Sequence, residues 1–216
     1  TSYRAGTMAI GRFSARRAWK IYPAFAVLIV VSGISDVLGG RLEGARFWAE
    51  SLFVQNYAPG RWNHAWSLAV EEHFYLLLPM FLTYLTSRSN RGRDPFRVIP
   101  LAACVVGVVE LLARIVTWWR FPIYSHYGNL FPTHLRLDSL FLGVALAYAY
   151  HFGRAAFVSR LRPYRHALAG GGALCLSPAF IFPLDGSSPF IFTAGLSVIA
   201  LASAAIVSGI LLSEWP

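Results

Sequence analysis

Residues 66–79 read WSLAVEEHFYLLLP, where two adjacent glutamates, Glu71 and Glu72, stand inside an otherwise apolar run. An ionisable residue at the bilayer centre costs about 2.5–3.5 kcal/mol on insertion scales, so such residues usually face a polar interior and often mark function. On a helix, Ser67, Glu71 and Tyr75 recur every four residues and share one face, whereas Glu72 points about 100° away. The stretch therefore predicts a membrane helix with a polar stripe that lines a cavity for a polyhydroxylated substrate.

The composition around this stretch is that of a membrane protein. Of the 216 residues, 56% are hydrophobic and 13% are charged, about half the charged fraction of roughly 25% in soluble domains. A helix needs about 20 mostly apolar residues to cross a bilayer core of roughly 30 Å. Six segments approach that length: 22–39, 66–86, 98–119, 135–152, 167–183 and 190–212. We expect an all-α, polytopic transmembrane bundle that forms a single integral-membrane domain over residues 1–216.

The basic residues indicate the orientation of the chain. Outside the six segments, Lys and Arg number 5, 3, 4, 1, 4 and 0 in successive connections. This alternation follows the positive-inside rule and puts the N-terminal segment and the loops 87–97 and 153–166 in the cytoplasm. The net charge of +9 is thus a topology signal, and we expect no nucleic-acid partner. The expected location is a bacterial inner (plasma) membrane, crossed several times.

The connection 41–65 is too polar to cross the membrane. Its apolar residues Phe47, Trp48, Leu52 and Phe53 precede a turn at Pro59 and Gly60. This pattern predicts a helix that lies in the membrane interface.

Small residues indicate where helices pack. Residues with small side chains recur four apart at Gly143 and Ala147 and at Ala200, Ala204 and Ser208, a spacing that permits close approach of helices in lipid. The triple glycine 170–172 is expected to form a flexible start of the fifth segment.

Further charged residues lie within the apolar segments. Glu71 and Glu72 are roughly 7–9 Å along their helix from Trp66, a depth measured from the outer face in the predicted topology. The outer half of the segments holds four acids and two arginines: Glu71, Glu72, Glu110, Asp138, Arg114 and Arg136. They form either separate structural ion pairs or the lining of one hydrated cavity, and six charges at one depth favour the cavity. His134 and Asp138 are four residues apart, as are Glu110 and Arg114, and no metal-binding spacing occurs.

Four stretches in order carry a resemblance to a known family. These are RRAWKIYP (16–23), SLFVQNYAP (51–59), WSLAVEEHFYLLLP (66–79) and THLRLDSLFLGVALA (133–147). Together they resemble the signature segments of the membrane acyltransferase-3 family, over positions 12 to about 150. The resemblance implies transfer of an acyl group, usually acetyl, from cytoplasmic acyl-CoA to a hydroxyl of an extracytoplasmic carbohydrate, a glycoconjugate or a similar acceptor.

The resemblance also implies roles for individual residues. Arg17 and Lys20, with the adjacent Arg16, match the basic segment that would hold the CoA phosphates, although the family usually has Arg where Lys20 stands. Glu71 and Glu72 match the paired glutamates and would support catalysis in the cavity. Substrate contacts are expected from Trp66, Ser67, Tyr75, His134, Arg136 and Asp138. His73 stands where the family usually has Gln.

The family's essential histidine lies on a first helix, upstream of the basic segment. We therefore expect this chain to be a fragment that lacks the first helices, to continue beyond residue 216, and to be inactive by itself. Neither His73 nor His134 is assigned as the missing base. Two other classes stay open: a transporter, whose buried charges form a proton or solute pathway, and a non-catalytic membrane module that recruits partners.

Overall fold

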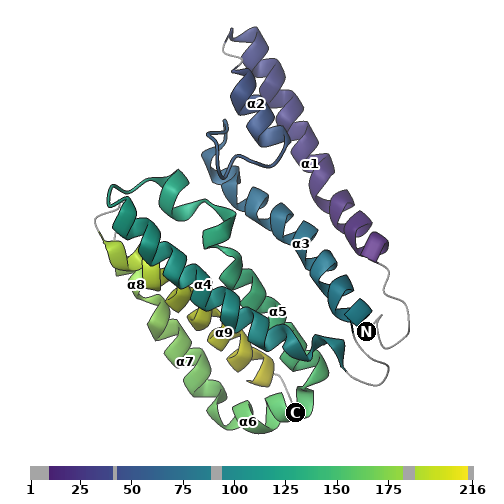
Figure 1. Ribbon diagram of the computed structural model, residues 1–216, viewed down its shortest axis with the longest axis vertical. Coiled ribbons are helices and arrows are strands. Elements are labelled where there is room, and N and C mark those ends of the chain that lie inside the picture. The colour runs from purple at the N-terminus through teal and green to yellow at the C-terminus, as the bar shows by residue number, and fades with distance from the viewer. Residues whose placement is uncertain (1–9, 41–42, 89–93, 182–187, 214–216) are drawn as a thin grey trace. The chain divides into compact units, whose positions relative to one another are not determined.

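The computed structural model describes residues 10–40, 43–88, 94–181 and 188–213 (Figure 1). Every regular element within these ranges is a helix, which confirms the predicted all-α class. Contacts along the chain define two compact units, Thr1–Thr83 and Tyr84–Pro216. The single domain predicted from the sequence stays a prediction.

The first unit contains a long helix, α1 (Ile10–Leu38), the short α2 (Gly44–Ser51), a 3₁₀ turn at Asn63–Ala65, and α3 (Trp66–Arg88), whose last five residues fall in the second unit. At 1.5 Å per residue, the 29 residues of α1 extend about 43 Å. Helix α1 begins twelve residues before the predicted segment 22–39, and Pro23 lies in its interior. Proline removes an internal hydrogen bond of a helix, but the apolar residues on both sides of Pro23 continue α1 through it.

The polar connection of the first unit folds back along α1. The rings of Phe25 and Phe53 stack with centroids 4.5 Å apart, and the Trp62 indole donates to the Ser32 hydroxyl at 3.0 Å. Phe25 lies thirteen residues before Leu38, which is about 20 Å along α1. The helix predicted in this connection is present as α2, and its contact with a membrane interface stays a prediction.

The second unit consists of helices packed side by side (Figure 1). Its α-helices are α4 (Ile99–Arg120), α5 (Leu137–Phe152), α6 (Arg154–Leu161), α7 (Arg165–Leu176), α8 (Pro178–Ile181) and α9 (Leu196–Ser213). Short 3₁₀ and π-helical turns lie between them at Pro95–Val98, His126–Leu130, Thr133–Leu135, Arg162–Tyr164 and Ile191–Gly195. Helix α9 packs against both α5 and α7, and α4 packs against α5.

Glycines bring α7 and α9 into close contact. A Cβ atom added at Gly172 would lie 2.8 Å from the Ala202 carbonyl oxygen, and one added at Gly209 would lie 2.9 Å from the Ala169 amide nitrogen. The prediction that the triple glycine is a flexible start of a segment is wrong, because residues 170–172 lie inside α7. Tight packing against α9 stabilises a helix that glycine alone would weaken.

Three helical stretches are long and apolar enough to cross a membrane: Gly11–Leu38, Pro95–Arg120 and Ile191–Ser213. A fourth is possible if α5 and the bent stretch Arg154–Ile181 count as one broken span. The described residues therefore show three to four spans where the sequence predicts six. Helix α3 carries two glutamates and His73, which lower its mean hydropathy, and α5 and α7 have only 16 and 12 residues.

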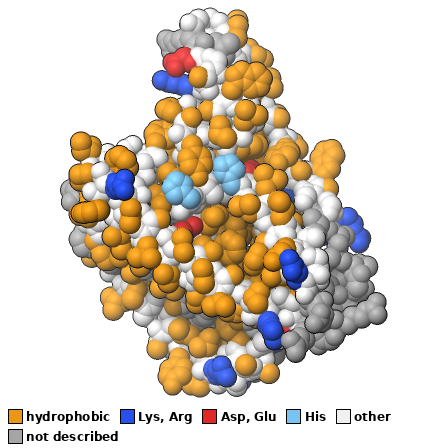
Figure 2. Space-filling model, viewed as in Figure 1, with side chains coloured by type: hydrophobic (Ala, Val, Ile, Leu, Met, Phe, Trp, Pro, Cys, Tyr) orange, Lys and Arg blue, Asp and Glu red, His pale blue; other side chains and the backbone are white. Residues whose placement is uncertain are grey.

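Apolar side chains cover much of the face shown in Figure 2. On α1, large exposed residues include Val27, Val30, Val31 and Ile34, which are 56–63% exposed. Exposed apolar surface of this extent is costly in water and suits contact with lipid. Together with the apolar helices, it supports a membrane protein.

Candidate functional site

Arg17 joins α1 to α3 in the first unit. Its Nη2 lies 3.0 Å from Glu71 Oε2, and its Nε lies 3.9 Å from Glu72 Oε1. The guanidinium carbon also lies 2.9 Å from the centre of the Tyr75 ring, a cation–π contact. With Tyr22, which donates to Glu72 Oε2 at 3.1 Å, these residues form what we call the α1–α3 cluster.

The α1–α3 cluster is only partly satisfied. Glu72 is 7% exposed, and while Tyr22 holds one of its oxygens, Oε1 is buried without a hydrogen-bond partner among the described residues. The Nε atom of Arg17 is in the same state, because the 3.9 Å between these two atoms is too long for a hydrogen bond. A buried polar atom without a partner costs about 1–3 kcal/mol. Arg17 and Glu72 therefore offer one donor and one acceptor to a group that enters between them.

The cluster corrects the predicted depths of its members. Arg17 was expected at the cytoplasmic mouth and the glutamates near the outer face, but the 3.0 Å ion pair puts Arg17 and Glu71 at one level. This level lies 21 residues before Leu38, which is about 31 Å along α1. The difference arises because the connection before α3 returns along α1, so α3 begins well inside the length of α1.

The predicted polar stripe is present in part. Glu71 and Tyr75 both contact Arg17, as their shared face requires, whereas Ser67 is exposed one turn earlier and Trp66 is half-buried. Sequence reasoning missed Tyr22, although a tyrosine in an apolar span, one turn from a basic cluster, is a usable signal.

The remaining basic residues of α1 face solvent or lipid. Arg16 and Lys20 are exposed, four residues apart on one face, and Arg16 Nε donates to the Arg12 carbonyl at 3.2 Å. Arg17 does not share this face, because it turns toward α3. The three basic residues are therefore divided between an exposed pair and a member of the cluster.

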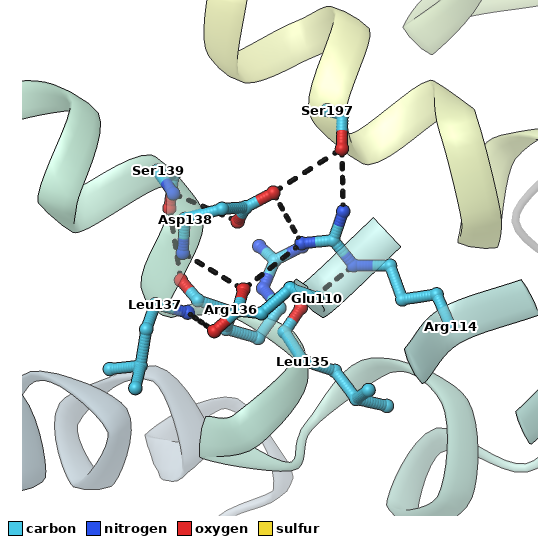
Figure 3. A network of polar contacts seen from close by, with 8 residues as sticks. All are labelled: Glu110, Arg114, Leu135, Arg136, Leu137, Asp138, Ser139 and Ser197. Carbon is cyan, nitrogen blue, oxygen red and sulfur yellow. Dashed lines mark hydrogen bonds and ion pairs between the residues drawn. The ribbon is translucent and has the colours of Figure 1, made fainter. Parts of the chain in front are cut away.

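A second polar network lies between α4, α5 and α9 in the second unit (Figure 3). Its centre is Arg114, whose side chain is 1% exposed and lies 2.6 Å from Asp138 Oδ2 and 3.4 Å from Glu110 Oε2. The same guanidinium donates to the Leu135 carbonyl and to the Ser197 hydroxyl, both at 2.9 Å. The expected i,i+4 pair of Glu110 and Arg114 is confirmed as one part of this Arg114 network.

Glu110 also caps α5 from outside that helix. Its two oxygens accept from the backbone N–H groups of Leu137 at 2.9 Å and Asp138 at 2.8 Å. The first N–H groups of a helix have no partner within it, and the positive end of the helix dipole favours an acid there. Because its acids and its arginine are all hydrogen-bonded, the Arg114 network is organised as a structural element.

The predicted substrate residues near this network are divided. Asp138 is buried and binds Arg114, Ser197 and the Ser139 amide, while Arg136 is half-buried beside it. His134 is exposed, and partial burial of its imidazole lowers its pKa. The Arg114 network and the α1–α3 cluster belong to different units, so a single cavity lined by all six charges stays a prediction.

A groove of about 620 Å³ runs between α5 and α9. Arg136, Asp138 and Ser139 lie among its polar lining residues, and its small lining residues include Gly143, Ala147, Ala200 and Ala204. Apart from its own helical turn, a Cβ atom at Gly143 would meet no atom of the described residues within 4 Å. Close packing was predicted at these four residues and at Ser208. The four border an open groove, whereas Ser208 is buried. The close glycine contacts at Gly172 and Gly209 lie between α7 and α9.

Among the described residues, no group of three or more His, Cys, Asp or Glu is arranged to hold a metal ion.

Comparison with known proteins points to acyltransferases. No family model matches the chain, and no solved structure does. O-acetyltransferase OatA of Staphylococcus aureus (strain NCTC 8325 / PS 47) is 22% identical over an alignment of 224 positions, gaps included. The alignment covers 95% of this chain and 36% of that protein. The putative O-acetyltransferase SACOL0978 of Staphylococcus aureus (strain COL) is 25% identical over 161 residues, which cover 66% of this chain and 26% of that protein.

These similarities support acyl transfer as the general class of reaction. The chain spans about a third of the length of OatA and about a quarter of that of SACOL0978.

Proposed function

We propose that the protein is part of a membrane O-acyltransferase of the acyltransferase-3 type. It would move an acetyl group from cytoplasmic acetyl-CoA to a hydroxyl of an extracytoplasmic carbohydrate or glycoconjugate. The observation that supports this most is the α1–α3 cluster, where residues of two signature segments meet and leave a donor and an acceptor open. The similarity to O-acetyltransferases along 95% of the chain supports the same reaction class.

Transfer of an acyl group to a hydroxyl requires a base for the hydroxyl proton and donors for the oxyanion that forms. Glu72 Oε1 would accept a hydrogen bond from the acceptor hydroxyl or from a histidine supplied by the rest of the protein. Arg17 Nε would donate to the oxyanion, while Glu71 and Tyr75 hold the guanidinium in position. In this proposal Glu72 supports the principal base and is not itself that base.

The donor side of the proposal rests on the exposed face of α1. Arg17 already serves two carboxylates, so Arg16 and Lys20 are left as the phosphate contacts of acetyl-CoA. Arginine provides a planar fork for a phosphate, and lysine a compact point charge. In this proposal the lipid bilayer lies between this end of α1 and the other end of the helix. The two ends are about 43 Å apart, because the helix has 29 residues.

The test is acetyl transfer by the intact protein in proteoliposomes, followed through release of free CoA and acetylation of a glycan acceptor. Wild-type protein should show both, and Glu72→Gln should reduce both at least a hundredfold with unchanged membrane insertion. A transporter would release no CoA, and wild-type turnover in Glu72→Gln would remove this carboxylate from the reaction.

A further inference from the structure

A small polar pocket lies between α1 and α2, at the end of α1 away from Arg16 and Lys20. Its volume is about 190 Å³, and its polar lining residues are Ser32, Asp36, Glu43, Arg46, Glu50 and Arg61. This α1–α2 pocket lies wholly within the first unit and shares no residue with the α1–α3 cluster.

Glu50 is the most buried member of the pocket. Its residue is 2% exposed, and the backbone N–H of Trp62 donates to its Oε1. A Cβ atom at Gly60 would lie 2.8 Å from Glu50 Cγ, so glycine at this position lets the chain close tightly around the carboxylate. A buried acid held this firmly is fixed in place before any ligand arrives, which lowers the cost of binding.

Two ion pairs form the wall and the mouth. Arg61 binds Asp36 and also donates to the Ser32 carbonyl at 2.7 Å. At the mouth, Arg46 Nε lies 2.8 Å from Glu43 Oε2, and these side chains are 53% and 59% exposed. The pocket is thus lined by both donor and acceptor groups, held in place by these pairs, and Phe47 contributes an apolar surface.

The charge and size of the pocket restrict what it can hold. Three carboxylates and two guanidinium groups give the lining a formal charge of −1, which disfavours phosphate and other anions. The volume equals that of about six water molecules at roughly 30 Å³ each. Donors and acceptors of both kinds beside the Phe47 ring suit vicinal hydroxyl groups and the C–H face of a sugar.

We propose that the α1–α2 pocket binds one uncharged, hydroxyl-rich ring of the acyl acceptor. The assignment to the acceptor rests on the proposed function, whereas the class of ligand rests on the pocket itself. Asp36 lies twenty residues from Arg16, about 30 Å along α1, which is roughly the thickness of the bilayer core. The pocket therefore belongs to the membrane side opposite the proposed donor site.

The position of the pocket on α1 also limits the length of the acceptor. Ser32 in the pocket lies ten residues after Tyr22, which contacts Glu72, so the two levels are about 15 Å apart. A ring in the pocket cannot itself present a hydroxyl to Glu72. The acceptor is accordingly an oligosaccharide or longer glycan, held by one ring and acetylated on another.

The experiment measures glycan binding separately from turnover. Intact protein in detergent is tested on an array of neutral and acidic oligosaccharides and the corresponding monosaccharides. Arg46→Gln and Glu43→Gln change exposed groups at the mouth, and Arg97→Gln, an exposed arginine of the second unit, is the matched control. We expect a neutral oligosaccharide to bind, at least tenfold weaker binding in both mouth variants, and wild-type binding in the control.

The outcomes distinguish this inference from the proposed function. Glycan binding that depends on the mouth residues, without any release of CoA from acetyl-CoA, keeps the pocket assignment and refutes the transferase. Acetyl transfer with unchanged acceptor KM in both mouth variants refutes the pocket and keeps the transferase. Preference for acidic glycans, or no neutral glycan bound, also overturns the inference and leaves the pocket as a hydrated structural core.

Discussion

Removing the Tyr22 hydroxyl tests whether the α1–α3 cluster positions Glu72 for chemistry. In Tyr22→Phe, Glu72 loses the 3.1 Å hydrogen bond to Oε2 and keeps only the distant Arg17. A hydrogen bond to a charged group contributes about 1.5–3 kcal/mol. Because Tyr22 is 45% exposed, water can partly replace the hydroxyl, so the lower figure of about 1.5 kcal/mol applies. A rise of this size in the activation free energy lowers the rate of transfer about tenfold.

The assay is steady-state acetyl transfer by the intact protein in proteoliposomes, with kcat and the KM for acetyl-CoA determined separately. We expect kcat to fall about tenfold with an unchanged KM, because Tyr22 acts on Glu72 and not on the donor. Tyr84→Phe is the matched control, since Tyr84 is a comparably exposed tyrosine, 56% exposed, in the same helix as Glu72. Equal kcat values for the two variants, or a fall that appears only in thermal stability, would refute the positioning role.

Three other perturbations have defined outcomes. Glu110→Ala removes one partner of a buried ion pair, which costs about 3–5 kcal/mol, so the thermal unfolding midpoint of this variant should drop sharply. The control Glu43→Ala removes an exposed ion pair worth at most about 1 kcal/mol and should leave the midpoint unchanged. Equal midpoints for the two variants would contradict the capping role of Glu110. Gly172→Leu should destabilise the second unit by about 1–3 kcal/mol through overpacking. Gly171→Leu should not, because apart from its own helical turn a Cβ at Gly171 meets no atom of the described residues within 4 Å. Chemical denaturation compares the free energies of unfolding of the two variants. Lys20→Gln should raise the KM for acetyl-CoA severalfold without changing kcat, and an unchanged KM would exclude this residue from the donor site.

The positions of the helices are the part of the fold that the sequence determines most directly. Helix α4 was expected over 98–119 and extends over Ile99–Arg120, and the segment 66–86 corresponds to α3 at Trp66–Arg88. Long apolar runs bounded by polar loops define these limits, because burying backbone polar groups in lipid requires a helix. Charged residues within these apolar runs need partners, but the sequence does not name the partners.

The partners depend on contacts between distant residues, which periodicity does not encode. The return of the polar connection along α1 depends on aromatic contacts such as Phe25 with Phe53, so the level of Glu71 could not be read from its distance to Trp66. Likewise, Glu110 appears in the sequence as half of an i,i+4 pair, and its capping of α5, 27 residues away at Leu137, emerges only in three dimensions.

The Arg114 network and the α1–α3 cluster differ in how fully their buried polar atoms are hydrogen-bonded, and this difference separates effects on stability from effects on function. In the Arg114 network every oxygen of Glu110 and Asp138 has a partner, so removing one member leaves others buried and unpaired, and folding weakens. In the α1–α3 cluster, Glu72 Oε1 and Arg17 Nε have no hydrogen-bond partner in the part of the chain that the structure describes, so the folded state carries this cost without a ligand. Replacing Glu72 by a neutral residue relieves part of that cost. Loss of acetyl transfer with undiminished thermal stability is therefore the signature that identifies this cluster as the reaction site.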